Sequence, residues 1–565
     1  MPEITSRTVD AAAFERLTAD GCDPRLARLF AARGLASMDE LATTLRALAA
    51  PERLHHVEDA ARLLADAIEA KRRLLIIADY DADGATACAV GVKALRAMGA
   101  VVDYLVPNRF EHGYGLTPEI VREAVARAPD ILITVDNGIA AVEGVAQANA
   151  LGMRVLVTDH HLPGTRIPDA ACIVNPNQAG CGFPSKNLAG VGVIFYVMLQ
   201  LRAELRRRGA FGPARPEPNL GALLDLVALG TVADVVKLDA NNRILVAQGL
   251  ARIRAGKASA GIAALLDIAG RTARQASAYD LGFAVGPRLN AAGRLKDMSL
   301  GIECLLAVDP ARALELATRL ERLNRERREI EAGMQESALA MVAAVEAGDA
   351  YTLSLHRAEW HTGVVGLLAA RLKDRFHRPV FAFAAESDGR LKGSGRSIAG
   401  LHLRDALDLI DKRAPGLVER FGGHAAAAGL TLRQGGLEEF RAAFEAVARA
   451  SLGPTDLARR IETDGELAAA DITVDFAQVL REQVWGQGFP EPRYLGRFSV
   501  ESQRVVGEKH MKLTLGLGSR RYGAIRFGSA APVPASIDAV YRLDVNEFQG
   551  TRSLQLVVEH LAASG

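Results

Sequence analysis

Short apolar runs alternate with helical stretches from about residue 70 onward. The runs have the length of buried strands and span Leu74–Ala78, Val101–Val106, Ile131–Val135 and Val155–Thr158. The segments between them carry helical signals, such as Thr117-Pro118-Glu119, where Thr can cap a helix and Pro suits its first position. This regular alternation of strands and helices predicts a parallel sheet with right-handed crossovers.

The pattern changes twice further along the chain. From about Asp309 to Val345 the sequence is strongly helical and charged, which predicts a long helix that joins two domains. A second α/β pattern follows, with a helix from Gly363 and a strand at Val380–Ala384. After Pro454, short alternating runs such as "KHMKLTLGL", "YGAIRF" and "RSLQLVVEHL" predict a small antiparallel barrel.

We therefore expect an α/β fold with an all-β C-terminal barrel, since 565 residues suffice for several domains. The expected parts are a helical lead-in (1–50), a parallel-sheet α/β domain (51–305), a long connecting helix (306–345), a second, smaller α/β domain (346–450) and the barrel (455–565).

The composition narrows the class of protein. The chain is 49% hydrophobic and 24% charged, as is usual for soluble globular proteins. No apolar run reaches the ~18 residues of a membrane span, and no secretory signal is expected at the N-terminus. Five cysteines without a CxxC pair favour a reducing cytoplasm over a cysteine-held zinc. The net charge is +1, so any nucleic-acid binding must be concentrated locally.

One stretch, "DYDADG", looks like the start of a calcium-binding EF-hand loop. Such a loop needs a preceding helix and a bidentate Glu at its twelfth position. Counting from Asp79, the twelfth residue is Val90, and the residues before Asp79 form a predicted strand. A calcium loop is therefore excluded, and a strand that ends in three carboxylates remains.

Three of the predicted strands end in aspartate. The first leads into Asp79, Asp81 and Asp83, the second into Asp136, and the third into Asp159-His160-His161. In open parallel sheets, ligands bind beyond the carboxyl ends of the strands, so these groups are expected at one rim. Asp234, in an apolar helical stretch, is a further candidate and a stronger one than Asp225.

Each of these acids alone is also compatible with a helix cap or a turn, but together they predict a metal centre. Crowded carboxylates repel one another and need a cation to stay ionised. Four or five Asp with a His form a ligand set for two divalent ions. Oxygen ligands suit Mg²⁺ and Mn²⁺, and imidazole shifts the preference toward Mn²⁺. Two such ions promote phosphoryl displacement. Of the adjacent His160 and His161, we expect one to bind a metal and the other to face the phosphate.

Several polar loops offer partners for an anionic substrate. Arg109 follows a predicted strand and is expected on the same rim. Arg288 and Asn290 lie in "GPRLNAAGRLKDMS", which we predict to be a loop rich in small residues.

Two glycine-rich motifs in the second α/β region add to these candidates. "GSGRS" contains Ser394 and Arg396, and its glycines can expose backbone N–H groups to a phosphate. "FGGHAAAAG" contains Gly423 and His424 and is predicted to open an Ala-rich helix whose N-terminus could face an anion.

These motifs resemble a known family. The Asp159-His160-His161 triplet, with "DYDADG" upstream, is similar to the defining motifs of the DHH phosphoesterase superfamily. "VPNRFEHGYGL", "TVDNGI", "VTDHHLPG", "NLAGVGV", "GPRLNAAGR", "KGSGRS" and "FGGHAAAAG", in this order, resemble the RecJ single-strand-specific DNA exonucleases. The closing "GEKHMKLTL" also resembles the end of bacterial RecJ.

The resemblance implies a fold, an activity and a setting. The expected fold is a catalytic DHH domain and a DHHA1 domain joined by a long helix, followed by an OB-fold. The expected activity is digestion of single-stranded DNA from the 5′ end to mononucleotides, with Mn²⁺ or Mg²⁺, in recombination and repair. The expected setting is a monomer in the bacterial cytoplasm, with single-strand-binding protein and a RecQ-type helicase as partners.

The resemblance also assigns roles to residues. Metal-site residues would be Asp79, Asp81, Asp83, Asp136, His160 and Asp234, and catalytic residues would be His161, Asp136 and Asp81. Substrate-binding residues would be Arg109, Arg288, Asn290, Ser394, Arg396, Gly423 and His424.

Three alternative classes predict other sequence features. A DHH-type phosphodiesterase acting on short oligonucleotides or cyclic dinucleotides would typically lack the C-terminal barrel. A non-catalytic scaffold would have lost acidic ligands. A Rossmann nucleotide-binding domain would carry GxGxxG after the first strand, where this sequence has "DADGAT".

Overall fold

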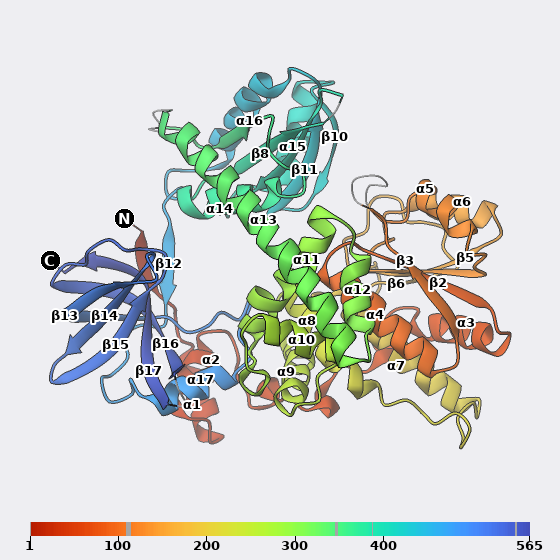
Figure 1. Ribbon diagram of the computed structural model, residues 1–565, viewed down its shortest axis with the longest axis horizontal. Helices are drawn as coiled ribbons and strands as arrows, with labels where there is room; N and C mark the ends of the chain where they lie inside the picture. The colour runs from red at the N-terminus through yellow and green to blue at the C-terminus, as the bar shows by residue number, and fades with distance from the viewer. Residues whose placement is uncertain (1, 109–114, 345–348, 387, 549–550, 565) are drawn as a thin grey trace. The chain divides into compact units, whose positions relative to one another are not determined.

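Five parallel strands form the predicted sheet in the computed structural model, which describes residues 2–108, 115–344, 349–386, 388–548 and 551–564 (Figure 1). The strand order is β3-β2-β4-β5-β6. The strands are β2 (Arg73–Ala78), β3 (Val101–Leu105), β4 (Ile131–Val135), β5 (Arg154–Thr158) and β6 (Cys172–Val174). The first four match the predicted runs to within one residue at each end, and β6 has no counterpart in the prediction.

Helices cover both faces of this sheet (Figure 1). They are α5 (Pro118–Val125) and α6 (Val142–Ala150) on one face, and α3 (Val57–Glu69), α4 (Ala82–Ala97) and α7 (Gly190–Arg207) on the other. Leu75 and Ile77 share a core with Ile120 of α5 and Val145 of α6. Ile76 points the opposite way, toward Gly91 of α4, because successive strand residues alternate between faces.

A helical region follows the sheet. Its elements are α8 (Leu224–Ala233), α9 (Ala240–Arg254), α10 (Ala260–Ile268), a π-helical turn η6 (Asp280–Val285), α11 (Gly286–Leu295), α12 (Ser299–Leu306) and α13 (Pro310–Ala344). The expectation of a loop around Arg288 and Asn290 is wrong, because both lie on α11. Leu289, Ala291 and Ala292 are buried there, so the small residues serve helix packing. The predicted long helix is confirmed as α13.

The chain divides into two units, and the boundary falls within α13. One unit comprises Ser6–Glu321 and Glu462–Gly565, and the other comprises Met1–Thr5 and Arg322–Ile461. The second unit contains a five-stranded sheet with the order β10-β11-β9-β8-β7. Its elements are β7 (Leu353–His356), α14 (Val365–Phe376), β8 (Val380–Ala385), β9 (Leu391–Arg396), α15 (Leu403–Arg413), β10 (Val418–Gly423), β11 (Ala427–Leu432) and α16 (Leu437–Ser451).

The prediction of an Ala-rich helix opened by Gly423 and His424 is wrong. Gly423 ends β10, His424 lies in the turn, and the alanines begin β11. Gly423 pairs with Ala428, and Ala428 in turn pairs with Gly395 of β9. This pairing within the sheet overrides the intrinsic helix propensity of alanine.

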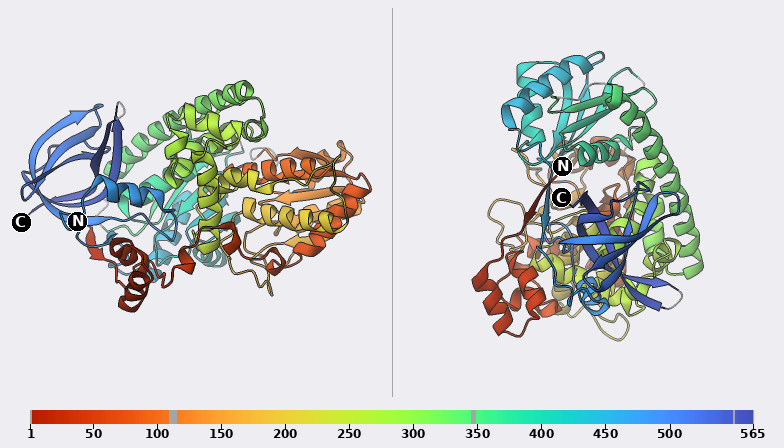
Figure 2. Two further views of the ribbon diagram at one scale, coloured as in Figure 1. Left: turned by 90° about the horizontal axis from the view of Figure 1, so that it is seen from below. Right: turned by 90° about the vertical axis from the view of Figure 1, so that its left-hand side faces the viewer.

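The C-terminal strands close into a barrel with the order β13-β14-β15-β17-β16, which confirms the predicted barrel, although β15 and β17 pair in parallel and not antiparallel as predicted. Its elements are a helix, α17 (Val474–Glu482), and the strands β13 (Tyr494–Val506), β14 (His510–Leu517), β15 (Arg520–Arg526), β16 (Ser536–Phe548) and β17 (Thr551–Ala563). Figure 2 shows the barrel strands, in blue, from two further directions. Among the described residues, no helix combines the length and apolar character needed to cross a membrane.

The predicted helical lead-in contains α1 (Ala11–Ala19) and α2 (Pro24–Ala31), but it also contains a strand. This strand, β1 (Glu3–Ser6), pairs with β12 (Arg460–Thr463). Arg33 forms a buried ion pair with Asp464 at 2.7 Å. The N-terminal segment is therefore joined to residues that follow the second α/β region by side-chain and backbone contacts.

Candidate metal centre

The first three aspartates lie where β2 meets α4. Asp79 is buried at the end of the strand and accepts a hydrogen bond from the Tyr80 amide at 2.7 Å. Asp81 is the N-cap of α4 and accepts from the Gly84 amide at 3.0 Å. A Cβ atom at Gly84 would lie 2.6 Å from the Asp79 carbonyl oxygen, so the loop needs glycine there to close. The helix start thus turns the loop and holds its carboxylates.

Asp83 has a second structural partner. Its carboxylate accepts hydrogen bonds from the Gly190 amide at 2.7 Å and the Val191 amide at 2.9 Å, in the first turn of α7. Backbone amides at a helix N-terminus stabilise negative charge. The contact ties the first turn of α4 to α7.

Asp136 follows β4 in a strained conformation. Its φ is 62°, a left-handed value that is uncommon for residues other than glycine. The carboxylate is buried against α7, where a Cβ atom at Gly190 would lie 2.5 Å from Asp136 Oδ1. The neighbouring Asn137 side chain donates to the carbonyls of Ile77 and Val135 and links the ends of β2 and β4. Backbone strain of this kind is typical of functional sites.

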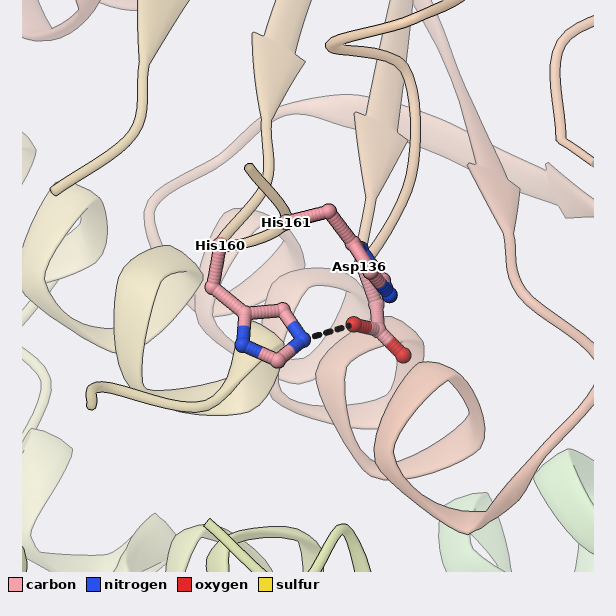
Figure 3. Close-up of side chains that lie close together, drawn as sticks. All are labelled: Asp136, His160 and His161. Atoms are coloured by element: carbon pink, nitrogen blue, oxygen red, sulfur yellow. Dashed lines mark ion pairs between the residues drawn. The ribbon is translucent and has the colours of Figure 1, made fainter. Parts of the chain in front are cut away.

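His160 lies between carboxylates from two different elements. Its Nε2 is 3.0 Å from Asp136 Oδ1 and 3.6 Å from Asp234 Oδ2. Figure 3 shows the His160 ring directed at the Asp136 carboxylate. Asp234 caps the C-terminus of α8, and Val235 after it has a φ of 62°. The turn out of α8 therefore brings Asp234 to the rim of the sheet.

Asp159 has a different task from the other acids. It is buried, and its Oδ1 is 2.7 Å from His161 Nδ1, while its Oδ2 accepts from the Ile139 amide at 2.8 Å. For His161, burial alone would lower the pKa, but the hydrogen bond with Asp159 and the nearby carboxylates together raise it to about 9. Asp159 thus fixes the orientation of His161 and favours its charged form.

The remaining acids disfavour one another's charge. Burial raises the pKa of Asp83 to about 7, and the negative charge of Asp81 adds to the shift. Burial and then the charge of Asp83 raise the pKa of Asp136 and of Asp234 well above the ordinary range. A bound cation would remove this penalty.

The geometry fits such a cation. Within the described part of the chain, three groups of side chains bring their ligand atoms within 4.8 Å of one another. The groups are Asp136 with His160 and His161, Asp83 with His160 and Asp234, and Asp79 with Asp81 and Asp136. The groups adjoin because Asp136 and His160 each belong to two of them. This arrangement is expected for more than one divalent ion with oxygen and imidazole ligands.

Comparison with known proteins identifies the family. Family models match "DHH family, N-terminal domain" over residues 73–231, "DHHA1 domain" over 341–450 and "RecJ OB domain" over 463–560. A "Single-stranded-DNA-specific exonuclease RecJ" of Dickeya dadantii is 52% identical over 555 residues, which is 96% of each chain. The chain belongs to the RecJ family.

Solved RecJ structures share the fold. Thermus thermophilus RecJ in complex with Mn²⁺ aligns with a TM-score of 0.81 and 30% identity, over 100% of this chain and 79% of that one. The same protein in complex with Mg²⁺ aligns with a TM-score of 0.75 and 29% identity, over 100% of this chain and 78% of that one. The DHH, DHHA1 and barrel architecture of this chain is therefore that of the RecJ family.

A second polar site lies in the DHHA1 region. Ser394 and Arg396 are two residues apart on β9, and an Arg396 nitrogen donates to Ser394 Oγ at 3.2 Å. A Cβ atom at Gly366, in the first turn of α14, would lie 2.9 Å from Ser394 Oγ and 3.2 Å from Arg396 Nη2. Burial lowers the pKa of Arg396, and no charge among the described residues offsets that shift. A desolvated cation beside a helix N-terminus is well suited to bind an anion.

Other predicted substrate residues have structural contacts of their own. Gly423 and His424 lie at the β10–β11 turn, and the His424 amide donates to the Ala427 carbonyl at 2.8 Å. Arg288 Nε is 2.7 Å from Glu321 Oε2, and Asn290 Oδ1 accepts from the Ala82 amide at 2.8 Å. Asn290 therefore holds the start of α4 beside the acidic loop. Arg109 lies outside the described residues.

Sequence reasoning assigned no supporting role to two residues of the site. Asp159 belongs to a motif visible in the sequence, but only the structure shows that it holds His161. Its position directly before two histidines is the sequence feature that could have indicated this role. Asn137 follows Asp136 in sequence and links the ends of β2 and β4, which only the strand pairing reveals.

Proposed function

We propose that this chain is a single-stranded-DNA-specific exonuclease that releases 5′-mononucleotides from the 5′ end with two Mn²⁺ or Mg²⁺ ions. The main support for this proposal is the set of three adjoining groups of Asp and His ligand atoms at the rim of the sheet. Membership of the RecJ family and the likeness to metal-containing RecJ structures support the same conclusion. The 5′-to-3′ direction rests on family resemblance.

Roles can be given to the chain's own side chains. We assign Asp79, Asp81, Asp83, Asp136, His160 and Asp234 to holding the ions. When bound, the two cations would supply the charge that activates a water and stabilises the attacking and leaving oxygens. Because Asp159 holds Nδ1 of His161, we assign contact with the substrate phosphate to Nε2 of that ring. The imidazolium form, favoured by the raised pKa, can donate a hydrogen bond to a phosphate oxygen.

The Ser394 and Arg396 pair would hold the terminal phosphate of the substrate, together with Gly423 at the end of β10 and His424 in the turn that follows. The closed barrel would bind single strands along a groove. The presence of the barrel also favours long substrates. It therefore counts against the alternative function, a DHH-type phosphodiesterase acting on short oligonucleotides or cyclic dinucleotides. We further propose a monomeric protein of the bacterial cytoplasm that acts in recombination and repair with single-strand-binding protein and a RecQ-type helicase.

Oligonucleotides labelled at one end test the proposal. With Mn²⁺ or Mg²⁺, a 5′ label should appear at once as a mononucleotide, while a 3′ label should remain on progressively shorter strands. A blunt duplex of the same sequence should resist digestion. Loss of the 3′ label first, or equal digestion of the duplex, would contradict the proposal. A cyclic dinucleotide in the same assay tests the alternative.

A further inference from the structure

Two aromatic side chains, one on η6 and one directly before it, are exposed and stacked on each other. Tyr279, just before the turn, is 50% exposed, and Phe283 is 71% exposed. Their ring centroids are 4.7 Å apart with an interplanar angle of 24°. Single exposed apolar residues are common, but a stacked pair presents a larger flat apolar surface to solvent.

The pair is held in place by the buried side of the same turn. Leu281, Ala284 and Val285 are buried, and Asp280 accepts hydrogen bonds from the backbone and hydroxyl of Ser277. π-Helical turns are rare and occur frequently at functional sites. The rings are therefore presented by an anchored segment.

This segment runs alongside the metal centre. A Cβ atom at Gly282 would lie 3.1 Å from Val232, and one at Gly286 would lie 3.2 Å from Ala233, both in the last turn of α8 before Asp234. The helix then continues as α11 to Asn290, which binds the Ala82 amide beside the acidic loop. At about 1.5 Å per residue, Phe283 and Asn290 are roughly 10 Å apart along this helix.

The charges beside the pair are balanced within the protein. The Arg542 guanidinium is 6.0 Å from the Tyr279 ring centroid, but it also lies 3.3 Å from Glu491 and 3.5 Å from Glu559. These carboxylates offset the charge of Arg542, so this cation does not make the ring pair a phosphate site. The ring faces are the available binding surface, and nucleobases stack on such faces without sequence preference.

We propose that Tyr279 and Phe283 form a stacking subsite for bases of the single-stranded substrate next to the metal centre. The inference rests on the proposed function. It names bases, and not phosphates, as the groups that this surface recognises.

The test measures binding of two 20-nucleotide probes by fluorescence anisotropy, with the full-length chain in EDTA so that the probes stay intact. One probe is oligo-dT, and the other has the same backbone with abasic sites. Tyr279→Ala/Phe283→Ala should weaken oligo-dT binding by about 10-fold and abasic binding by less than about twofold. Phe283→Tyr should retain binding, whereas Phe283→Leu, which keeps apolar bulk, should lose part of it.

Val308→Ala is the control, because Val308 is 86% exposed in the same unit and carries no ring. It should bind both probes like the parent. Equal weakening of the binding of both probes by the double variant would overturn the inference. Unchanged binding of oligo-dT would overturn it as well, and would point to a protein partner for the aromatic pair. If the parent also fails to digest the end-labelled oligonucleotides with Mn²⁺ or Mg²⁺, the proposed function itself fails, and this inference with it.

Discussion

At the rim of the first sheet, carboxylates are crowded together and each raises the pKa of its neighbours. On β9 of the other unit, the half-buried Arg396 guanidinium has no acid among the described residues that offsets the cost of its burial. Both regions leave buried charge uncompensated, but with opposite signs. Buried charge is costly unless it is paired, so each region indicates the charge of its ligand. The first suits cations and the second suits a phosphate.

The largest effect should come from removing a carboxylate at the rim. We expect Asp234→Asn to lower the exonuclease rate by more than about 100-fold, because even residues that only support metal ligands cost 10–100-fold when changed. Steady-state rates on oligo-dT with Mn²⁺ provide the measurement.

Asp225 supplies a control from the same helix, since it is buried on α8, which Asp234 caps, but accepts a hydrogen bond from the Ser259 amide at 2.6 Å. Asp225→Asn should retain the specific activity of its folded fraction. Equal losses in the two variants would show that the effect comes from α8 packing and not from metal binding.

A smaller and different effect is expected in the DHHA1 sheet. Arg396→Gln should reduce the preference for 5′-phosphorylated over 5′-hydroxyl DNA by about 10–100-fold, in line with the loss of charge-assisted hydrogen bonds. The ratio of kcat/KM for the two substrates measures this. Arg420→Gln changes an exposed arginine on β10, which β11 separates from β9 in the same sheet, and should leave the ratio unchanged. If Arg396→Gln does not alter this ratio, the claim that the Arg396 site binds the terminal phosphate is contradicted.

The smallest effect concerns stability without metal. The folded pKa of Asp83 is about 7 against an ordinary 3.8, so the folded chain binds more protons than the unfolded chain between these values. Its stability should therefore fall as the pH rises from about 4 to about 7. Urea unfolding in EDTA across this range should show a steeper fall for the parent than for Asp83→Asn. Parallel curves for the two proteins would show that Asp83 is not the source of the pH dependence.

Local patterns predicted much of the fold. Buried strands such as β4 (Ile131–Val135) have continuous apolar runs, and Thr117 and Pro118 mark the start of α5, where Thr117 Oγ1 accepts from the Ile120 amide. The failures are segments whose structure depends on distant partners. The alanines of β11 are in a strand because β9 and β10 flank them, and β1 forms only by pairing with β12, far away in sequence.

For the site, the sequence likewise predicted which residues come together but not all of their contacts. The position of acids after strands predicted that Asp79, Asp136 and His160 meet at one rim, as the structure shows. The role of Asp159 depends on side-chain direction, which spacing does not encode. Likewise, the amides of α7 that bind Asp83 lie more than 100 residues away, so only the folded chain brings them together.

Counting bound Mn²⁺ by electron paramagnetic resonance tests the central claim most directly. The account predicts two Mn²⁺ per chain at neutral pH, fewer or weaker sites in Asp136→Ala, and two unchanged sites in Arg396→Gln. Absence of Mn²⁺ binding by the parent, or the same number and affinity of sites in Asp136→Ala, would contradict it.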